Sequence, residues 1–439
     1  MRTTRAANLR TTVAALAACA AWSLALDAQN LAEAPPALDG VASTSPRADL
    51  RRTRDAFIDI RDYSAALTPA QTVVDEQREQ RDAEYPADLA ALGLIQAELR
   101  ATDDALDHLV AAIEIVETAE GATSPTLIEY YRGLGRTYIK GGRYQEAIVS
   151  LEQAQHISQR NLGLFNVEQA PLLDDITTAY LGLGDTVEAR KMQVERLDNA
   201  IRRFGADDPR VIPYRYTLAR YYEQSRLPES AREQYEEVLK AEETRLGSGN
   251  AGLLAPLREL VALDLLVAQA VDPERRDRLV ALLEENGEAS PAERGLSLAL
   301  LGDWEIVAGN PVAARDYYRQ AWTTMQANPG LDVAAYFGKP TMIDFVPPLS
   351  PVDRAERSRP YTWAEIALEF DVSADGLPMN VRVATRDQQT TALQSRYSRR
   401  MRETHFRPRL VDGVPVATTN VRSTHFVRRY VDRDEEEAE

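Results

Sequence analysis

A small residue recurs every 42 residues through the middle of the chain, and this period restricts the possible folds strongly. The residue is alanine at four positions separated by three successive steps of 42 residues, Ala105, Ala147, Ala189 and Ala231. Apolar residues surround each alanine at spacings of three and four, which is typical of one face of a helix. A unit of this length holds two helices that cannot bury their apolar faces alone, so neighbouring units must stack. The sequence therefore predicts a mainly α array rather than a single compact core.

One copy of the repeat defines the pattern most clearly. Its spacing is Tyr131-x2-Leu134-Gly135-x2-Tyr138, then Ala147-x3-Leu151-x2-Ala154. This pattern resembles the tetratricopeptide repeat, although tyrosine replaces the leading tryptophan and the period exceeds the usual length of about 34 residues. The resemblance implies about seven helical hairpins over residues 47–335, stacked as a right-handed superhelix whose groove binds proteins or peptides. A degenerate copy is expected between Ala231 and Ala314, with helices near Leu253–Ala268 and Pro273–Glu285.

Some side chains of the first helices are not needed for packing and should point into that groove. The candidates are Arg132, Arg136, Lys140, Tyr216 and Arg220, and the four cations among them could hold an acidic ligand. The same residues would also suit an ordinary solvated helix face, so both interpretations stay open. The copy that contains Ala189 departs from the pattern, because Gln193 and Arg196 take positions that are usually apolar.

The first 28 residues predict an export signal. Three arginines precede an apolar run from Val13 to Leu26, and small residues follow. The run is shorter than the roughly 20 residues that a membrane-spanning helix needs. We expect cleavage after Ala25 or Ala28, a flexible segment over residues 29–46 and a periplasmic location. The stretch that ends at Cys19 resembles a lipoprotein lipobox, so lipidation of Cys19 or a retained N-terminal anchor stay alternatives that would attach the chain to a membrane.

Charge and residue usage exclude several classes of function. The net charge of −17 would repel nucleic-acid phosphates. Cys19 is the only cysteine, which excludes intrachain disulfides and a structural thiolate zinc site. The sequence has no histidine pair at metal spacing, no glycine-rich phosphate loop and no Gly-x-Ser-x-Gly motif. We therefore expect no catalytic residues, no cofactor and no metal, and we expect proteins or peptides as partners.

The pattern changes near residue 340. Five prolines between Lys339 and Pro360 predict a stiff linker over residues 336–361. Charge also changes sign, because residues 354–430 hold 14 arginines against 8 acids. The last residues, 431–439, form an acidic tail. The sequence thus predicts a second, smaller domain over residues 362–430.

Alternating apolar residues predict that this domain is α+β. A strand around Phe370, a tight turn at Asp375-Gly376, a second strand, a helix from about Gln388 to Glu403 and a last strand from about Val414 to Arg428 follow in order. Together with Phe406-Arg407-Pro408 and Gly413-x-Pro415-Val416, this order resembles the C-terminal domain of the TonB family.

The TonB resemblance implies binding rather than catalysis. Domains of that family pair with a short extended segment of outer-membrane transporters at an exposed sheet edge. Here the edge would be the residues Thr419, Asn420, Val421, Arg422, Ser423, Thr424, His425 and Phe426. Arg422, Arg396, Arg399 and Arg400 would either meet acidic groups of the partner or form an ordinary solvated charged face. The expected function is an exported adaptor, and the alternative is an energy transducer for transmembrane transport. The predicted linker is short for a transducer, since it could span only about 70 Å.

Overall fold

The computed structural model describes residues 46–267, 272–286, 289–328, 330–348, 361–384 and 390–430. The predicted signal (1–28), Cys19, nearly all of residues 29–46 and the acidic tail (431–439) lie outside these residues. The chain divides into two compact units between Tyr221 and Tyr222. Among the described residues, none of the helices has both the length and the apolar character needed to cross a bilayer.

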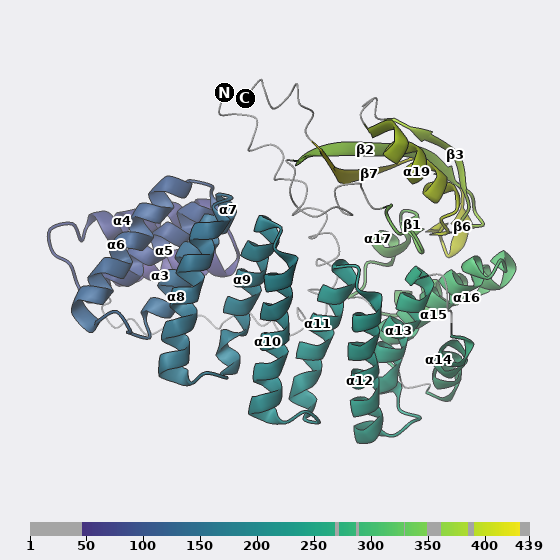
Figure 1. Cartoon of the computed structure of the whole chain (residues 1–439), viewed down its shortest axis with the longest axis horizontal. Helices are drawn as coiled ribbons and strands as arrows, with labels where there is room; N and C mark the ends of the chain where they lie inside the picture. The colour runs from purple at the N-terminus through teal and green to yellow at the C-terminus, as the bar shows by residue number, and fades with distance from the viewer. Residues whose placement is uncertain are drawn as a thin grey trace. The chain divides into compact units, whose positions relative to one another are not determined.

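The first unit is built of antiparallel helical hairpins (Figure 1). Its helices are α3 (Pro46–Asp59), α4 (Tyr63–Asp75), α5 (Tyr85–Glu98), α6 (Thr102–Glu120), α7 (Leu127–Lys140), α8 (Tyr144–Leu162), α9 (Ala170–Leu183), α10 (Thr186–Phe204) and most of α11 (Ile212–Gln224). Short 3-10 turns at Val167–Gln169 and Pro209–Val211 precede α9 and α11. Each hairpin reproduces the two-helix unit that the 42-residue period predicts.

The repeated alanines lie where two helices of a hairpin approach each other. Ala105, Ala147 and Ala189 are each 0% exposed. In the hairpin of α7 and α8, Gly135 faces this contact, because a Cβ atom added to it would lie 3.2 Å from the carbonyl oxygen of Ala147. The helices therefore pack backbone against backbone at this point, as the small residues predict.

The hairpin of α9 and α10 uses polar contacts at the positions that break the pattern. Gln193 is buried, and its Nε2 donates at 2.9 Å both to Asp174 Oδ1 and to Thr177 Oγ1. Arg196 Nε lies 3.3 Å from Asp174 Oδ1, and its guanidinium stacks 4.9 Å from the ring centroid of Tyr214. The departure from the apolar pattern is thus compensated by hydrogen bonds at Gln193 and by an ion pair and a cation–π contact at Arg196.

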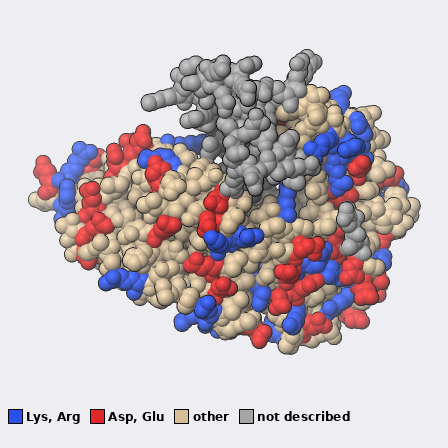
Figure 2. Space-filling view, viewed as in Figure 1, with Lys and Arg blue, Asp and Glu red and all other residues tan. Residues whose placement is uncertain are grey.

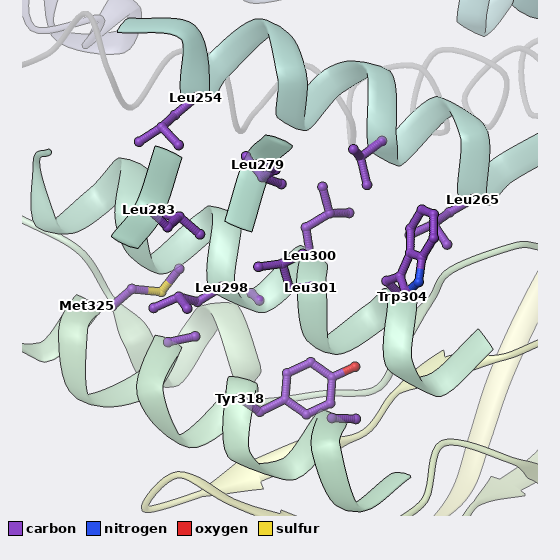
Figure 3. Close-up of a cluster of buried hydrophobic side chains, with 14 of the residues drawn as sticks. Leu254, Leu265, Leu279, Leu283, Leu298, Leu300, Leu301, Trp304, Tyr318 and Met325 are labelled. Carbon is purple, nitrogen blue, oxygen red and sulfur yellow. The ribbon is translucent and has the colours of Figure 1, made fainter. Parts of the chain in front are cut away.

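The second unit combines helices with strands. Its helices are α12 (Pro228–Leu246), α13 (Leu254–Val267), α14 (Pro273–Glu285), α15 (Pro291–Val307), α16 (Pro311–Gln326), α17 (Val333–Phe337) and α19 (Thr391–Arg402). Its strands are β1 (Thr341–Met342), β2 (Tyr361–Val372), β3 (Pro378–Val383), β4 (Phe406–Arg407), β5 (Arg409–Val411), β6 (Val414–Val416) and β7 (Thr418–Tyr430). Leucines from α13, α14 and α15 meet Tyr318 and Met325 of α16 in its helical core (Figure 3).

The C-terminal sheet has the strand order β3-β2-β7, and all its pairs are antiparallel. Alternate residues of β2, among them Ile366, Leu368 and Phe370, pack against Leu393 and Tyr397 of α19. α19 thus covers one face of the sheet (Figure 1). The predicted α+β character of this part is confirmed.

The structure corrects two boundaries in this region. The first half of the predicted linker is not an extended spacer, because Phe337 lies in the helical core, Phe345 lies in the core of the sheet, and β1 pairs with β4. The second half, residues 349–360, lies outside the described part. The predicted last strand is two strands, since Asp412 and Gly413, both at positive φ, fold β5 back on β6 before β7 begins.

Candidate protein-binding surfaces

β7 is an edge strand. It pairs with β2 from Tyr361↔Tyr430 to Val372↔Thr418, and within the described part of the chain no strand pairs with its other side. An edge strand presents a row of backbone N–H and C=O groups that can bind a further strand. This strand contains all eight residues that the sequence predicts for the acceptor edge.

The ladder determines which of these backbone groups point outward. Ala384 N donates to Ala367 O, so the backbone groups of Ala367 point toward β3. The backbone groups of the flanking residues, Ile366 and Leu368, therefore point toward β7, where they pair with His425 and Ser423, respectively. Because successive residues of a strand alternate, the N–H and C=O groups of the intervening residues of β7 point away from the sheet. These outward residues are Arg422, Thr424 and Phe426.

The other edge of the sheet is less open. The carbonyl oxygen of Val381 in β3 accepts a hydrogen bond from Arg402 of α19, at 3.4 Å. Pro378 begins the strand without an N–H group, and Asn380 has a φ of 53°, which interrupts the extended backbone. Such features block strand pairing at an edge. β7 is therefore the better acceptor of the two edge strands.

The regular part of the acceptor edge starts later than the sequence predicts. Asn420 has a φ of 56°, and its backbone N already donates to Asp371 Oδ1 at 2.9 Å. The register of β2 and β7 shifts at the same place, between Phe370 and Val372. Thr419 and Asn420 thus belong to a bulge, and the regular edge begins at Val421.

The side chains of β7 alternate between two environments. Arg422 and Phe426 lie on the face away from α19, where Arg422 forms a loose ion pair with Glu365 at 3.6 Å. His425 lies on the α19 face, with its ring centroid 4.9 Å from that of Phe345 and 5.0 Å from that of Tyr397. Burial among these rings lowers the pKa of His425 to about 4, so this side chain is neutral near pH 7.

The basic residues of α19 divide into two groups. Arg400 is engaged, because it donates to Asp344 O at 2.7 Å. Arg396 and Arg399 form no ion pair with any other described residue. Figure 2 shows Lys and Arg side chains gathered over the C-terminal sheet. Of the three cations that the sequence proposes on this helix, two can therefore meet an acidic group.

The three cations of α7 come together on one helix, but acids of the neighbouring first helices already pair with them. Arg132 Nε lies 2.7 Å from Asp175 Oδ2 of α9. Lys140 Nζ lies 2.5 Å from Glu98 of α5, and Arg136 lies 3.9 Å from the same carboxylate. Burial raises the pKa of Asp175, although the adjacent Arg132 counteracts this effect. These ion pairs join successive first helices.

Tyr216 and Arg220 lie together on α11, with the Arg220 guanidinium 5.9 Å from the Tyr216 ring centroid. The partner acids Glu98 and Asp175 were missed by reasoning from one repeat at a time. They lie about one period from their cations along the chain, and this spacing could have revealed them. In the part of the chain that is described, three or more His, Cys, Asp or Glu residues nowhere group as a metal site would require.

Comparison with known proteins identifies the repeats. The tetratricopeptide repeat family matches residues 86–160. No curated protein matches the chain. Several solved structures share limited similarity with it. One is a structure of nearly identical TPR-like repeats from a putative kinesin light chain of Podosopora anserina. It is 20% identical to this chain, the match covers 47% of this chain and 99% of that chain, and the TM-score is 0.36.

Two further structures are similar to this chain. A thermophilic TPR protein of Thermus thermophilus is 19% identical, with 44% and 91% of the two chains covered and a TM-score of 0.31. A tetratricopeptide repeat protein of Parabacteroides merdae is 14% identical, with 63% and 93% covered and a TM-score of 0.34. The family match and the hairpins of α5 to α8 together show that residues 86–160 are tetratricopeptide repeats.

Proposed function

We propose that the chain is an exported, periplasmic adaptor that binds one protein through its tetratricopeptide array and accepts an extended segment of another at β7. Repeats of this type are protein-binding scaffolds, which supports a protein partner in general. The N-terminal sequence supports export, and the order of motifs after residue 362 supports a TonB-like domain. An outer-membrane transporter segment is the partner that this resemblance suggests.

The observation that carries the proposal is the open edge of β7. At Arg422, Thr424 and Phe426 the backbone N–H and C=O groups point away from β2, and no described strand pairs with that side of β7. An added strand would form its hydrogen bonds with these three residues. An acidic side chain of the added strand would be favoured next to Arg422, and an apolar side chain next to Phe426.

Substitution of Thr424 tests the proposal. Thr424→Pro removes one outward N–H group but leaves the pairing with β2 intact, because proline is tolerated on an edge strand whose N–H faces solvent. Thr424→Val keeps the N–H group and serves as the matched control. The probe is a 12-residue unstructured peptide selected from a random library for binding to the full chain, and fluorescence anisotropy measures its Kd.

We expect Thr424→Pro to weaken binding of the selected peptide by about tenfold or more, the equivalent of one lost hydrogen bond and its register. Thr424→Val should change the Kd by less than about threefold. Circular dichroism confirms that both variants keep their sheet. Equal affinity of the proline variant and the wild type would show that the peptide does not pair with β7.

A further inference from the structure

A buried ion pair joins the helices of the second unit to its sheet. Arg407 of β4 is 9% exposed, and Asp303 of α15 is 4% exposed. Arg407 Nε donates to Asp303 Oδ1 at 2.9 Å, and a terminal nitrogen of the same guanidinium donates to Oδ2. Two parallel hydrogen bonds of this kind fix the relative orientation of both side chains.

Two tyrosines complete the surroundings of this pair. The hydroxyl of Tyr318, in α16, donates to Asp303 Oδ1 at 2.9 Å. The ring centroid of Tyr336, in α17, lies 4.8 Å from the guanidinium carbon of Arg407. Burial alone would lower the pKa of Arg407, but the adjacent charge of Asp303 holds this pKa well above its usual value. Arg407 is therefore a largely buried cation whose charge Asp303 balances.

Apolar packing extends the same contact. Leu410 of β5 lies in the core cluster of α13–α17, together with Phe337. Gly413 lies against Trp322 of α16, since a Cβ atom at that glycine would come within 3.3 Å of the indole ring. At the exposed margin, Arg315 of α16 pairs with Asp375. The contact thus involves several separate segments of the C-terminal domain.

We infer that Arg407 and Asp303 are positioning residues that make the C-terminal sheet and α15–α16 one cooperative unit. The constraint reaches the acceptor edge through Phe406, whose ring centroid lies 5.3 Å from that of Phe370 in β2. Phe370 in turn pairs with Val421 of β7. The edge strand is thereby held in a fixed orientation to the last hairpin rather than carried on a free module. This inference does not depend on strand addition itself.

Hydrogen exchange of the full chain in increasing urea tests the inference. In the wild type, amides of α15 and of β2 should open together, with the same dependence on urea. Arg407→Gln leaves the carboxylate of Asp303 buried without its cation. We expect the amides of β2 and β7 to exchange roughly 100-fold faster than in the wild type. They should also open at lower urea than the amides of α15. Arg315→Gln, in the exposed pair of the same contact, should change exchange by less than about threefold.

Two results would overturn the inference. One is independent opening of α15 and β2 in the wild type, and the other is an effect of Arg407→Gln no larger than that of Arg315→Gln. If Arg407→Gln does not fold, the double variant Asp303→Asn/Arg407→Gln tests the inference instead. Because it removes both buried charges, it should fold and should protect β2 better than Asp303→Asn alone. Protection equal to or lower than that of Asp303→Asn would contradict the inference.

Discussion

Replacing Gly135 of α7 by alanine should destabilise the first unit, although alanine is the better helix former. The helix preference alone would favour alanine by about 1 kcal/mol. The new Cβ, however, would lie 2.5 Å from Cγ of Leu151 and 3.2 Å from the carbonyl oxygen of Ala147. Leu151 is 0% exposed and cannot move aside without displacing its neighbours. Overpacking of this kind costs about 1–3 kcal/mol, so we expect a net loss of up to about 2 kcal/mol.

Gly133 in the same helix provides the matched control. A Cβ there would meet Cδ2 of Leu94 at 2.9 Å, but that side chain is 39% exposed and its end can rotate away. Gly133→Ala therefore gains helix preference without overpacking, and we expect its stability to stay equal or to rise by up to about 1 kcal/mol.

Urea titrations of the full chain, followed by circular dichroism, compare the midpoints of both variants with that of the wild type. Gly135→Ala should unfold at lower urea than Gly133→Ala. If Gly135→Ala proves as stable as Gly133→Ala, the conclusion that α7 and α8 pack backbone against backbone at Gly135 is wrong.

Three further predictions follow from buried or paired charges. His425 has a folded-state pKa of about 4 against 6.5 when unfolded, so the unfolded chain binds its proton first and stability falls as pH drops from 6.5 to 4. The loss is at most about 3 kcal/mol, and denaturation at several pH values should show it in the wild type but not in His425→Phe. Asp88→Ala should destabilise the first hairpin by about 3–5 kcal/mol, because Arg51 and Arg54 both pair with this buried carboxylate; limited proteolysis between α3 and α5 measures the effect. Arg136→Glu should weaken capture of a protein partner by the repeat array in pull-downs. The midpoint of unfolding should stay nearly unchanged, because Arg136 is 46% exposed and only loosely paired. An unchanged yield of the captured protein would remove Arg136 from the proposed binding site.

The repeat architecture could be predicted from the sequence because its signal is periodic. Ala105, Ala147 and Ala189 each lie where the two helices of a hairpin approach closely, and each is buried. One repeat unit therefore predicts the next, including the weakly marked helices α13 and α14, which lie within about two residues of their predicted bounds.

The parts that the sequence could not reveal depend on contacts between distant residues. Arg407 and Asp303 lie 104 positions apart, and nothing local to either residue indicates their pairing. Prolines near residue 340 favour an extended chain, yet Phe337 and Phe345 each enter a core, because burial of large aromatic side chains outweighs local backbone preference. The three cations of α7 were likewise predicted without their partner acids, which lie on adjacent repeats.

Residue-by-residue amide exchange along β7 tests the central claim most directly. In the free chain, amides of Ser423 and His425 should be protected by β2, while those of Arg422, Thr424 and Phe426 should exchange with solvent. A bound partner segment should protect these three as well. Protection of all five amides in the free chain, or of Thr424 in place of Ser423, would show that the edge is occupied or differently registered, and would contradict the account.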